Sequence, residues 1–175
     1  NVLRSLGRLQ GVSALAADLG VVYTSGAIVA GAESERPAVI EPTASACVGS
    51  RAPHAWVDLR GDRKSMLDLF GTNFVLVTGT DGIAWHEAAR NVSHALDIPL
   101  GVAAIGGPEI QVVSDEWRSA YGIDPDGAVL VRPDGYIAWR SAGVAADATA
   151  TLQQVIARVL ALDVEERRDA IASRA

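Results

Sequence analysis

Cysteine is almost absent from this sequence, with Cys47 the only one in 175 residues. An intrachain disulfide, a CxxC redox pair and a cysteine-rich zinc site are therefore excluded. Basic residues are also in deficit, with 15 Lys and Arg against 21 Asp and Glu. The resulting net charge of −6 argues against binding to nucleic acid, whose phosphates require a basic surface, and against attraction to an anionic membrane.

Long apolar runs are missing as well. No run reaches the roughly 18 to 20 residues that a membrane span requires, and no signal peptide opens the chain, so we expect a cytoplasmic protein. Hydrophobic residues make up 49% of the sequence and charged residues 21%, which is typical of a globular domain. The chain begins at Asn1 rather than at methionine, which we interpret as a fragment of a longer protein.

The first 50 residues divide into two segments of different character. Large aliphatic residues recur every three or four positions from Leu3 to Leu19, as on one face of a helix, and Gly20 provides a stop signal. We therefore predict a helical junction segment over residues 1–22. Residues 23–50 are rich in Ala, Gly, Ser and Pro without periodicity, which predicts an extended linker.

A single domain is predicted over residues 51–162, followed by a charged tail over 163–175. Apolar patterns predict strands at 55–59, 74–78, 100–105, 128–131 and 136–140. Helices are expected after Asp81, whose side chain would cap the first turn, and around 152–160, with shorter helical segments at 65–70 and around Trp117. The order of a βαβ unit and a ββα unit predicts an α/β, thioredoxin-like fold, with a central mixed β-sheet flanked by helices on both faces.

Four stretches carry a resemblance to a known family: LAADLGVVYTSGAIV at 15–29, GSRAPHAW at 49–56, LDLFG at 67–71 and YGIDPDGAVLVRPDGYIAWR at 121–140. The chain resembles the C-terminal, thioredoxin-like domain of FAD-dependent aromatic hydroxylases, of the phenol and dichlorophenol monooxygenase and polyketide hydroxylase type. The resemblance implies a parent enzyme that binds FAD, takes hydride from NADPH and hydroxylates a phenolic ring with O2. It also implies a partner, the FAD- and substrate-binding domain of that parent.

The chain itself lacks the motifs for this chemistry. Neither the glycine fingerprint nor the Gly-Asp motif with which the family holds FAD is present. Residues 80–86, TDGIAWH, occupy the position where a thioredoxin has its two cysteines. We therefore expect a redox-inactive structural and interaction domain that binds no cofactor or metal, present here without the FAD-binding domain.

Other candidate sites have simpler explanations. Cys47 lies in the linker rather than at a helix N-terminus, which favours an inert thiol over a peroxidatic one. His86 and His94 would lie about 12 Å apart along one helix, too far to share a metal ion, so we expect a solvent-exposed helix face. The carboxylates of Asp124 and Asp126 are explained by turns as well as by acid–base catalysis.

Four residues are candidates for contact with another domain or subunit: Arg51, Arg132, Trp139 and Arg140. Trp139 and Arg140 end the predicted hairpin, and for Trp139 a core position and an interface position are equally open. Arg51 and Arg132 are candidate charged partners. We expect docking on the hydroxylase body and, in addition, contact with a second copy of the chain in a homodimer. Alternative functions are a stand-alone thioredoxin-fold reductase or peroxidase, against which the single cysteine counts, and a small-molecule binding module.

Overall fold

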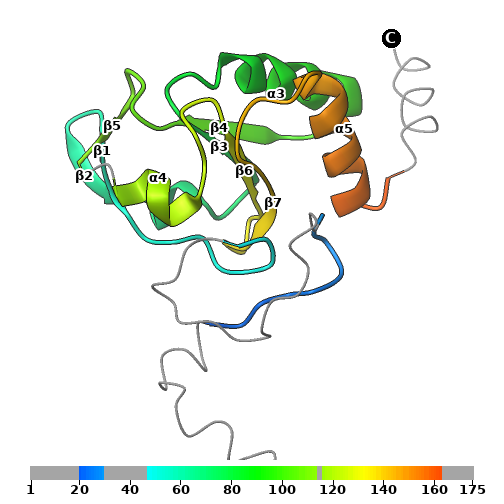
Figure 1. The fold of residues 1–175 in the computed structure, drawn as a ribbon, viewed down its shortest axis with the longest axis horizontal. Helices are drawn as coiled ribbons and strands as arrows, with labels where there is room; N and C mark the ends of the chain where they lie inside the picture. The colour runs from blue at the N-terminus through cyan, green and yellow to red at the C-terminus, as the bar shows by residue number, and fades with distance from the viewer. Residues whose placement is uncertain (1–19, 30–46, 114–115, 163–175) are drawn as a thin grey trace, which may run out of the picture.

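The computed structural model describes residues 20–29, 47–113 and 116–162 (Figure 1). Over these residues it is a mixed α/β fold with two β-sheets and three α-helices. The predicted helix before residue 20, residues 30–46 of the predicted linker and the predicted charged tail lie outside the described residues. In the described ranges, no helix has the length and apolar character needed to span a membrane.

The larger sheet has four strands in the order β4-β3-β6-β7. These strands are β3 (Phe74–Thr78), β4 (Leu100–Ala104), β6 (Ala128–Val131) and β7 (Ile137–Ser141). Strands β3 and β4 are parallel and the other two pairings are antiparallel, so the prediction of a mixed central sheet is confirmed. The inner strands β3 and β6 are almost wholly apolar because both faces of the sheet are covered.

Helices cover both faces of this sheet, as predicted (Figure 1). Helices α3 (Ile83–Leu96) and α5 (Ala148–Val159) pack on one face, and α4 (Glu116–Tyr121) lies on the other. The start of α3 corrects the sequence prediction, because Gly82 is the N-cap and no side chain caps the helix. Asp81 instead donates its backbone N–H to the Pro125 carbonyl at 3.0 Å, which joins the loop before α3 to the loop before β6.

A second, smaller sheet was only partly predicted. It consists of β1 (Trp56–Leu59), β2 (Asp62–Ser65) and β5 (Ile110–Val112), which are antiparallel in the order β2-β1-β5. The pattern predicted β1 but missed β2 and β5. Both are edge strands, and the two together contain one buried residue. Neither therefore has the alternation of buried and exposed residues that is typical of a half-buried strand. The predicted helical segment that follows β2 is a 3-10 helix, Met66–Leu69, with Ser65 as its N-cap.

The described part of the predicted linker is bound to the free edge of β7. Gly49 donates its N–H to the Ile137 carbonyl at 2.8 Å, and Tyr23 donates its N–H to the Gly49 carbonyl at 2.8 Å. A β-bulge leaves Ala138 without a partner residue in β6, and its carbonyl accepts the N–H of Val29 at 2.7 Å. We use the name junction segment for the described residues 20–29 only and not for the helix predicted over residues 1–22. Figure 1 shows it in blue beside the cyan chain that follows residue 47.

Candidate functional site

Two of the predicted interface residues, Arg51 and Arg132, lie together at the β6–β7 turn. The Arg51 guanidinium lies 5.4 Å from the centroid of the Tyr136 ring, and the Arg132 guanidinium lies 5.3 Å from the Tyr23 ring. The two tyrosine rings meet edge to face, with centroids 4.8 Å apart. We refer to Tyr23, Arg51, Arg132 and Tyr136 as the junction cluster, because it joins the junction segment to the hairpin.

The junction cluster is a basic and aromatic surface on an acidic chain. Arg132 also forms an ion pair with Asp134, so the cluster and its neighbour contain two guanidinium groups and one carboxylate. Tyr23 is 42% exposed and Arg51 is exposed, whereas the Arg132 side chain is 19% exposed. Each cation–π contact at such an exposed site stabilises the cluster by about 0.5–1 kcal/mol. The arrangement can bind a partner surface, but it holds no pair of groups for acid–base or nucleophilic chemistry.

Trp139 and Arg140 lie elsewhere. The indole of Trp139 is 8% exposed and packs edge-on against Trp85 of α3, with ring centroids 5.3 Å apart. Of the two positions left open for Trp139, the structure therefore shows the core. Arg140 is half-buried on β7, where it pairs in register with Val129 of β6. The structure thus brings together two of the four predicted interface residues.

Residues 78–86 run from the carboxyl end of β3 into the first turn of α3, and they include residues 80–86, the predicted counterpart of a thioredoxin's two cysteines. Thr78 Oγ1 and His86 Nε2 are 2.7 Å apart, in the arrangement of a hydroxyl nucleophile and its base. Thr78 is completely buried, however, so a substrate has no access to its hydroxyl. His86 is half-buried, and burial followed by the nearby charge of Arg90 lowers its pKa. The prediction of an exposed helix face is correct for His94 and wrong for His86.

Backbone from the loop before β6 closes this end of the sheet. Gly79 donates its N–H to the Gly127 carbonyl at 3.4 Å, and a Cβ on Gly79 would overlap the Pro125 carbonyl. The indole N–H of Trp85 donates to the Asp126 carbonyl at 2.9 Å. The backbone of residues 125–127 therefore packs against the first turn of α3, which leaves no room there for a ligand.

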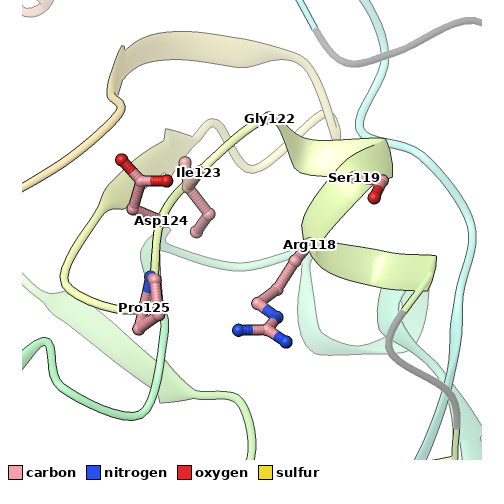
Figure 2. Close-up of a pocket in the computed structure, with 6 residues that line it drawn as sticks. All are labelled: Arg118, Ser119, Gly122, Ile123, Asp124 and Pro125. Atoms are coloured by element: carbon pink, nitrogen blue, oxygen red, sulfur yellow. The ribbon is translucent and has the colours of Figure 1, made fainter.

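A surface pocket of about 460 Å³ lies between α4 and the loop that leads to β6 (Figure 2). Its lining residues are Arg118, Ser119, Gly122, Ile123, Asp124 and Pro125. Figure 2 shows the Arg118 guanidinium extending toward Pro125, with the Asp124 carboxylate directed away from it. In the part of the chain that the structure describes, no three His, Cys, Asp or Glu side chains gather to hold a metal ion. One guanidinium and one hydroxyl, with a carboxylate directed away from the guanidinium, do not define a ligand class.

The cysteine lies in an environment typical of an inert thiol. Cys47 is 2% exposed, and its neighbourhood is fixed by Ser50, whose hydroxyl donates to the Cys47 carbonyl at 2.8 Å and accepts the Cys47 N–H at 3.1 Å. Burial keeps the thiol from the solvent and from a second thiol of another molecule.

Comparison with known proteins identifies the family. A family model described as "Aromatic-ring hydroxylase, C-terminal" matches residues 45–161. The chain belongs to this family. The chain is 42% identical over 148 residues to aklavinone 12-hydroxylase of Streptomyces purpurascens, covering 81% of this chain and 26% of that protein. It is 35% identical over 146 residues to phenol 2-monooxygenase of a Pseudomonas species, covering 79% of this chain and 24% of that protein.

A solved structure is similar over most of this aromatic-ring hydroxylase domain. The crystal structure of a ternary complex of aklavinone-11 hydroxylase with FAD and aklavinone superimposes with a TM-score of 0.81 at 38% identity, covering 86% of this chain and 28% of that one. The chain thus spans about a quarter of the length of the relatives that it matches. The resemblance found in the sequence, to hydroxylases of phenol and polyketide type, is confirmed.

Sequence reasoning missed Tyr23 and Tyr136 of the junction cluster, and it missed Gly49, whose carbonyl accepts the Tyr23 N–H. Tyr136 had a signal, because it follows the Arg132–Gly135 turn and its carbonyl accepts the Arg132 N–H at 2.8 Å, as hairpin geometry requires. Tyr23 and Gly49 had none. Their contact depends on how the chain crosses the edge of β7, which no local pattern encodes.

Proposed function

We propose that the chain is the redox-inactive structural and interaction domain of an FAD-dependent aromatic-ring hydroxylase. Membership of the C-terminal family supports this proposal, because the chain spans about a quarter of its relatives' length. The deciding observation is that the sequence contains one cysteine, Cys47, and that this cysteine is buried. An intramolecular thiol–disulfide cycle needs two.

The arrangement that we propose is thioredoxin-like. Strand β3, helix α3 and strand β4 make a βαβ unit with parallel strands, and β6, β7 and α5 make a ββα unit. The two units pair through β3 and β6, and helices lie on both faces of the resulting sheet. These are the features that the sequence order predicted for such a fold.

FAD and NADPH belong, in this proposal, to the rest of the parent enzyme. The glycines that follow the parallel strands β3 and β4 do not fit a dinucleotide, because protein atoms fill the space beside them. A Cβ on Gly79 would meet the Pro125 carbonyl, and one on Gly106 would meet Thr80. Nucleotide-binding glycines instead leave room for a pyrophosphate. The described residues therefore supply structure and contacts to the enzyme rather than a flavin site.

A chimaera tests the structural role. The chain replaces the region that it matches in aklavinone-11 hydroxylase, whose structure with FAD is solved. We expect the chimaera to be soluble and to retain FAD, whereas the same host without any C-terminal domain loses FAD or aggregates. Equal FAD content and equal melting temperature of the truncated host and the chimaera would show that the domain has no structural role.

Two further parts of the proposal concern assembly and location. The predicted homodimer is tested by sedimentation of the 175-residue chain over a range of concentrations. A cytoplasmic location is supported by the low use of cysteine, since reducing compartments do not favour structural disulfides.

A further inference from the structure

The junction segment is fixed to the domain rather than tethered loosely to it. Its backbone is hydrogen-bonded to Gly49 through Tyr23 and to Ala138 of β7 through Val29. Its aliphatic side chains Val22 and Ile28 are both 7% exposed. A segment held by backbone bonds at two points and by two buried side chains has one orientation relative to the sheet. The described chain therefore enters the domain at a defined place, Gly20.

That place is beside the junction cluster. Tyr23 is three positions from Gly20, where the described residues begin, and its exposed ring contacts Tyr136 and Arg132. About three quarters of each relative's length lies outside the part that this chain matches, and the family is defined as C-terminal. In a parent protein of this family the remainder would precede this domain, and the described chain begins at Gly20, close to the junction cluster.

A second exposed aromatic–arginine pair lies on the small sheet and serves as a comparison. Arg63 stacks over Trp56 at 4.5 Å, and Trp56 is 45% exposed. Its chemistry matches that of the junction cluster, but β1 and β2 lie away from the junction segment (Figure 1). Exposure and composition alone thus do not distinguish the two surfaces. The position at which the preceding chain connects does distinguish them.

We infer that the junction cluster is the surface on which the preceding flavin- and substrate-binding body of the same polypeptide docks, and that Arg51 and Tyr23 are its main contacts. The inference rests on the proposed function. Tyrosine and arginine are the residue types that dominate binding energy at interfaces, and the cluster provides both. The two guanidinium groups outnumber the one carboxylate, Asp134, so the cluster favours an acidic partner surface. Its tyrosine rings favour aromatic or apolar groups on that surface.

The test uses the chimaera with two matched double variants. The first, Tyr23→Ala with Arg51→Glu, removes the docking ring and reverses the exposed charge. The second, Trp56→Ala with Arg63→Glu, makes the same chemical change on the small sheet. The rate of proteolysis between body and domain and the hydrogen exchange of residues 20–29 are measured for each. We expect the first variant to raise the cleavage rate at least about tenfold, which corresponds to a loss of about 1.4 kcal/mol of docking energy from the two main contacts together. The second variant leaves it unchanged.

The outcomes separate this inference from the proposed function. If the unsubstituted chimaera is no more stable than the truncated host, the proposed function fails. If the chimaera is stable and the two double variants have equal cleavage rates, only the docking surface is wrong. Melting of the isolated 175-residue chain checks folding; should the first variant be destabilised there, Arg51→Glu alone decides, because that side chain is exposed. A dimer of the isolated chain that the first variant dissociates would make the surface a contact between copies and overturn the inference.

Discussion

Gly49 sets how closely the junction segment approaches β7. Its φ is +89°, in the region that favours glycine, and a Cβ at this position would overlap the Tyr23 carbonyl oxygen. Two constraints therefore act on one residue. Backbone conformation penalises any side chain here, and the neighbouring segment leaves no space for one.

We predict that Gly49→Ala destabilises the domain more than Gly26→Ala does. Gly26 has nearly the same φ, +92°, but no atom lies within 4 Å of the position that a Cβ would take, so alanine there meets only the conformational penalty of about 1 kcal/mol. At Gly49 the overlap must also be relieved, and we expect a total loss of about 2–4 kcal/mol. Urea unfolding of both variants measures the difference. Equal losses would mean that the junction segment shifts away at no cost.

His86 makes the stability of the domain depend on pH. Burial, and then the charge of Arg90, lower the pKa of His86 below its usual 6.5, so the unfolded chain binds the proton more readily than the folded one. Above pH 6.5 His86 is neutral in both states, and the domain has its full free energy of unfolding. Below pH 6.5 the unfolded chain takes up the proton first, so the free energy of unfolding falls. We predict that stability decreases from pH 7.5 to 5.5, and that His86→Gln makes this decrease smaller. Urea midpoints at the two pH values test this, and an unchanged difference in the variant contradicts it.

At the scale of elements, the junction segment acts as cover for the edge of the main sheet. Val22 and Ile28 are buried, and each such side chain contributes about 1.5–3 kcal/mol. A chain that starts at Ala30 loses both, together with the hydrogen bond to Ala138. We predict that this truncation lowers the free energy of unfolding by about 3–6 kcal/mol, as measured by urea denaturation against the full chain. An unchanged midpoint would show that the segment is not part of the folded unit.

The elements that the sequence predicted well are those whose burial is decided locally. Strand β3 and strand β6 are apolar runs, and α3 buries one stripe that includes Trp85 and Leu96, so the pattern alone indicates them. The elements that it missed, β2 and β5, exist because β1 pairs with them. Arg51 and Arg132 were selected as candidates from composition and position. Their aromatic partners depend on the crossing of distant segments, which the sequence does not specify.

At the scale of the whole molecule, the two ends of the main sheet differ in role. Val75, near the start of β3, is paired with Val131, next to the β6–β7 turn and the junction cluster. Thr78, at the other end of β3, is paired with Ala128, and there the loops pack on each other. In our proposal one end binds the hydroxylase body, whereas the end that is reactive in a thioredoxin is closed.

We predict that the isolated chain is colourless and does not reduce insulin disulfides. No dinucleotide motif is present in its sequence, and its one cysteine, Cys47, is buried. Absorbance near the flavin bands after purification and turbidity in the insulin assay are the measurements, with Cys47→Ser as the matched control. Bound FAD in equal molar amount, or reduction that disappears in the control, contradicts the prediction.

The bulge at Ala138 has a mechanical consequence. It turns a carbonyl of β7 outward to bind Val29, so a pull on the chain before residue 20 reaches the sheet through β7 and then β6. We expect the hydrogen bonds of the junction segment to break before the core formed by α3 and α5 is disturbed, because they are few and lie at the edge of the sheet. We therefore expect residues 20–29 to detach first under tension, while the rest of the domain stays folded.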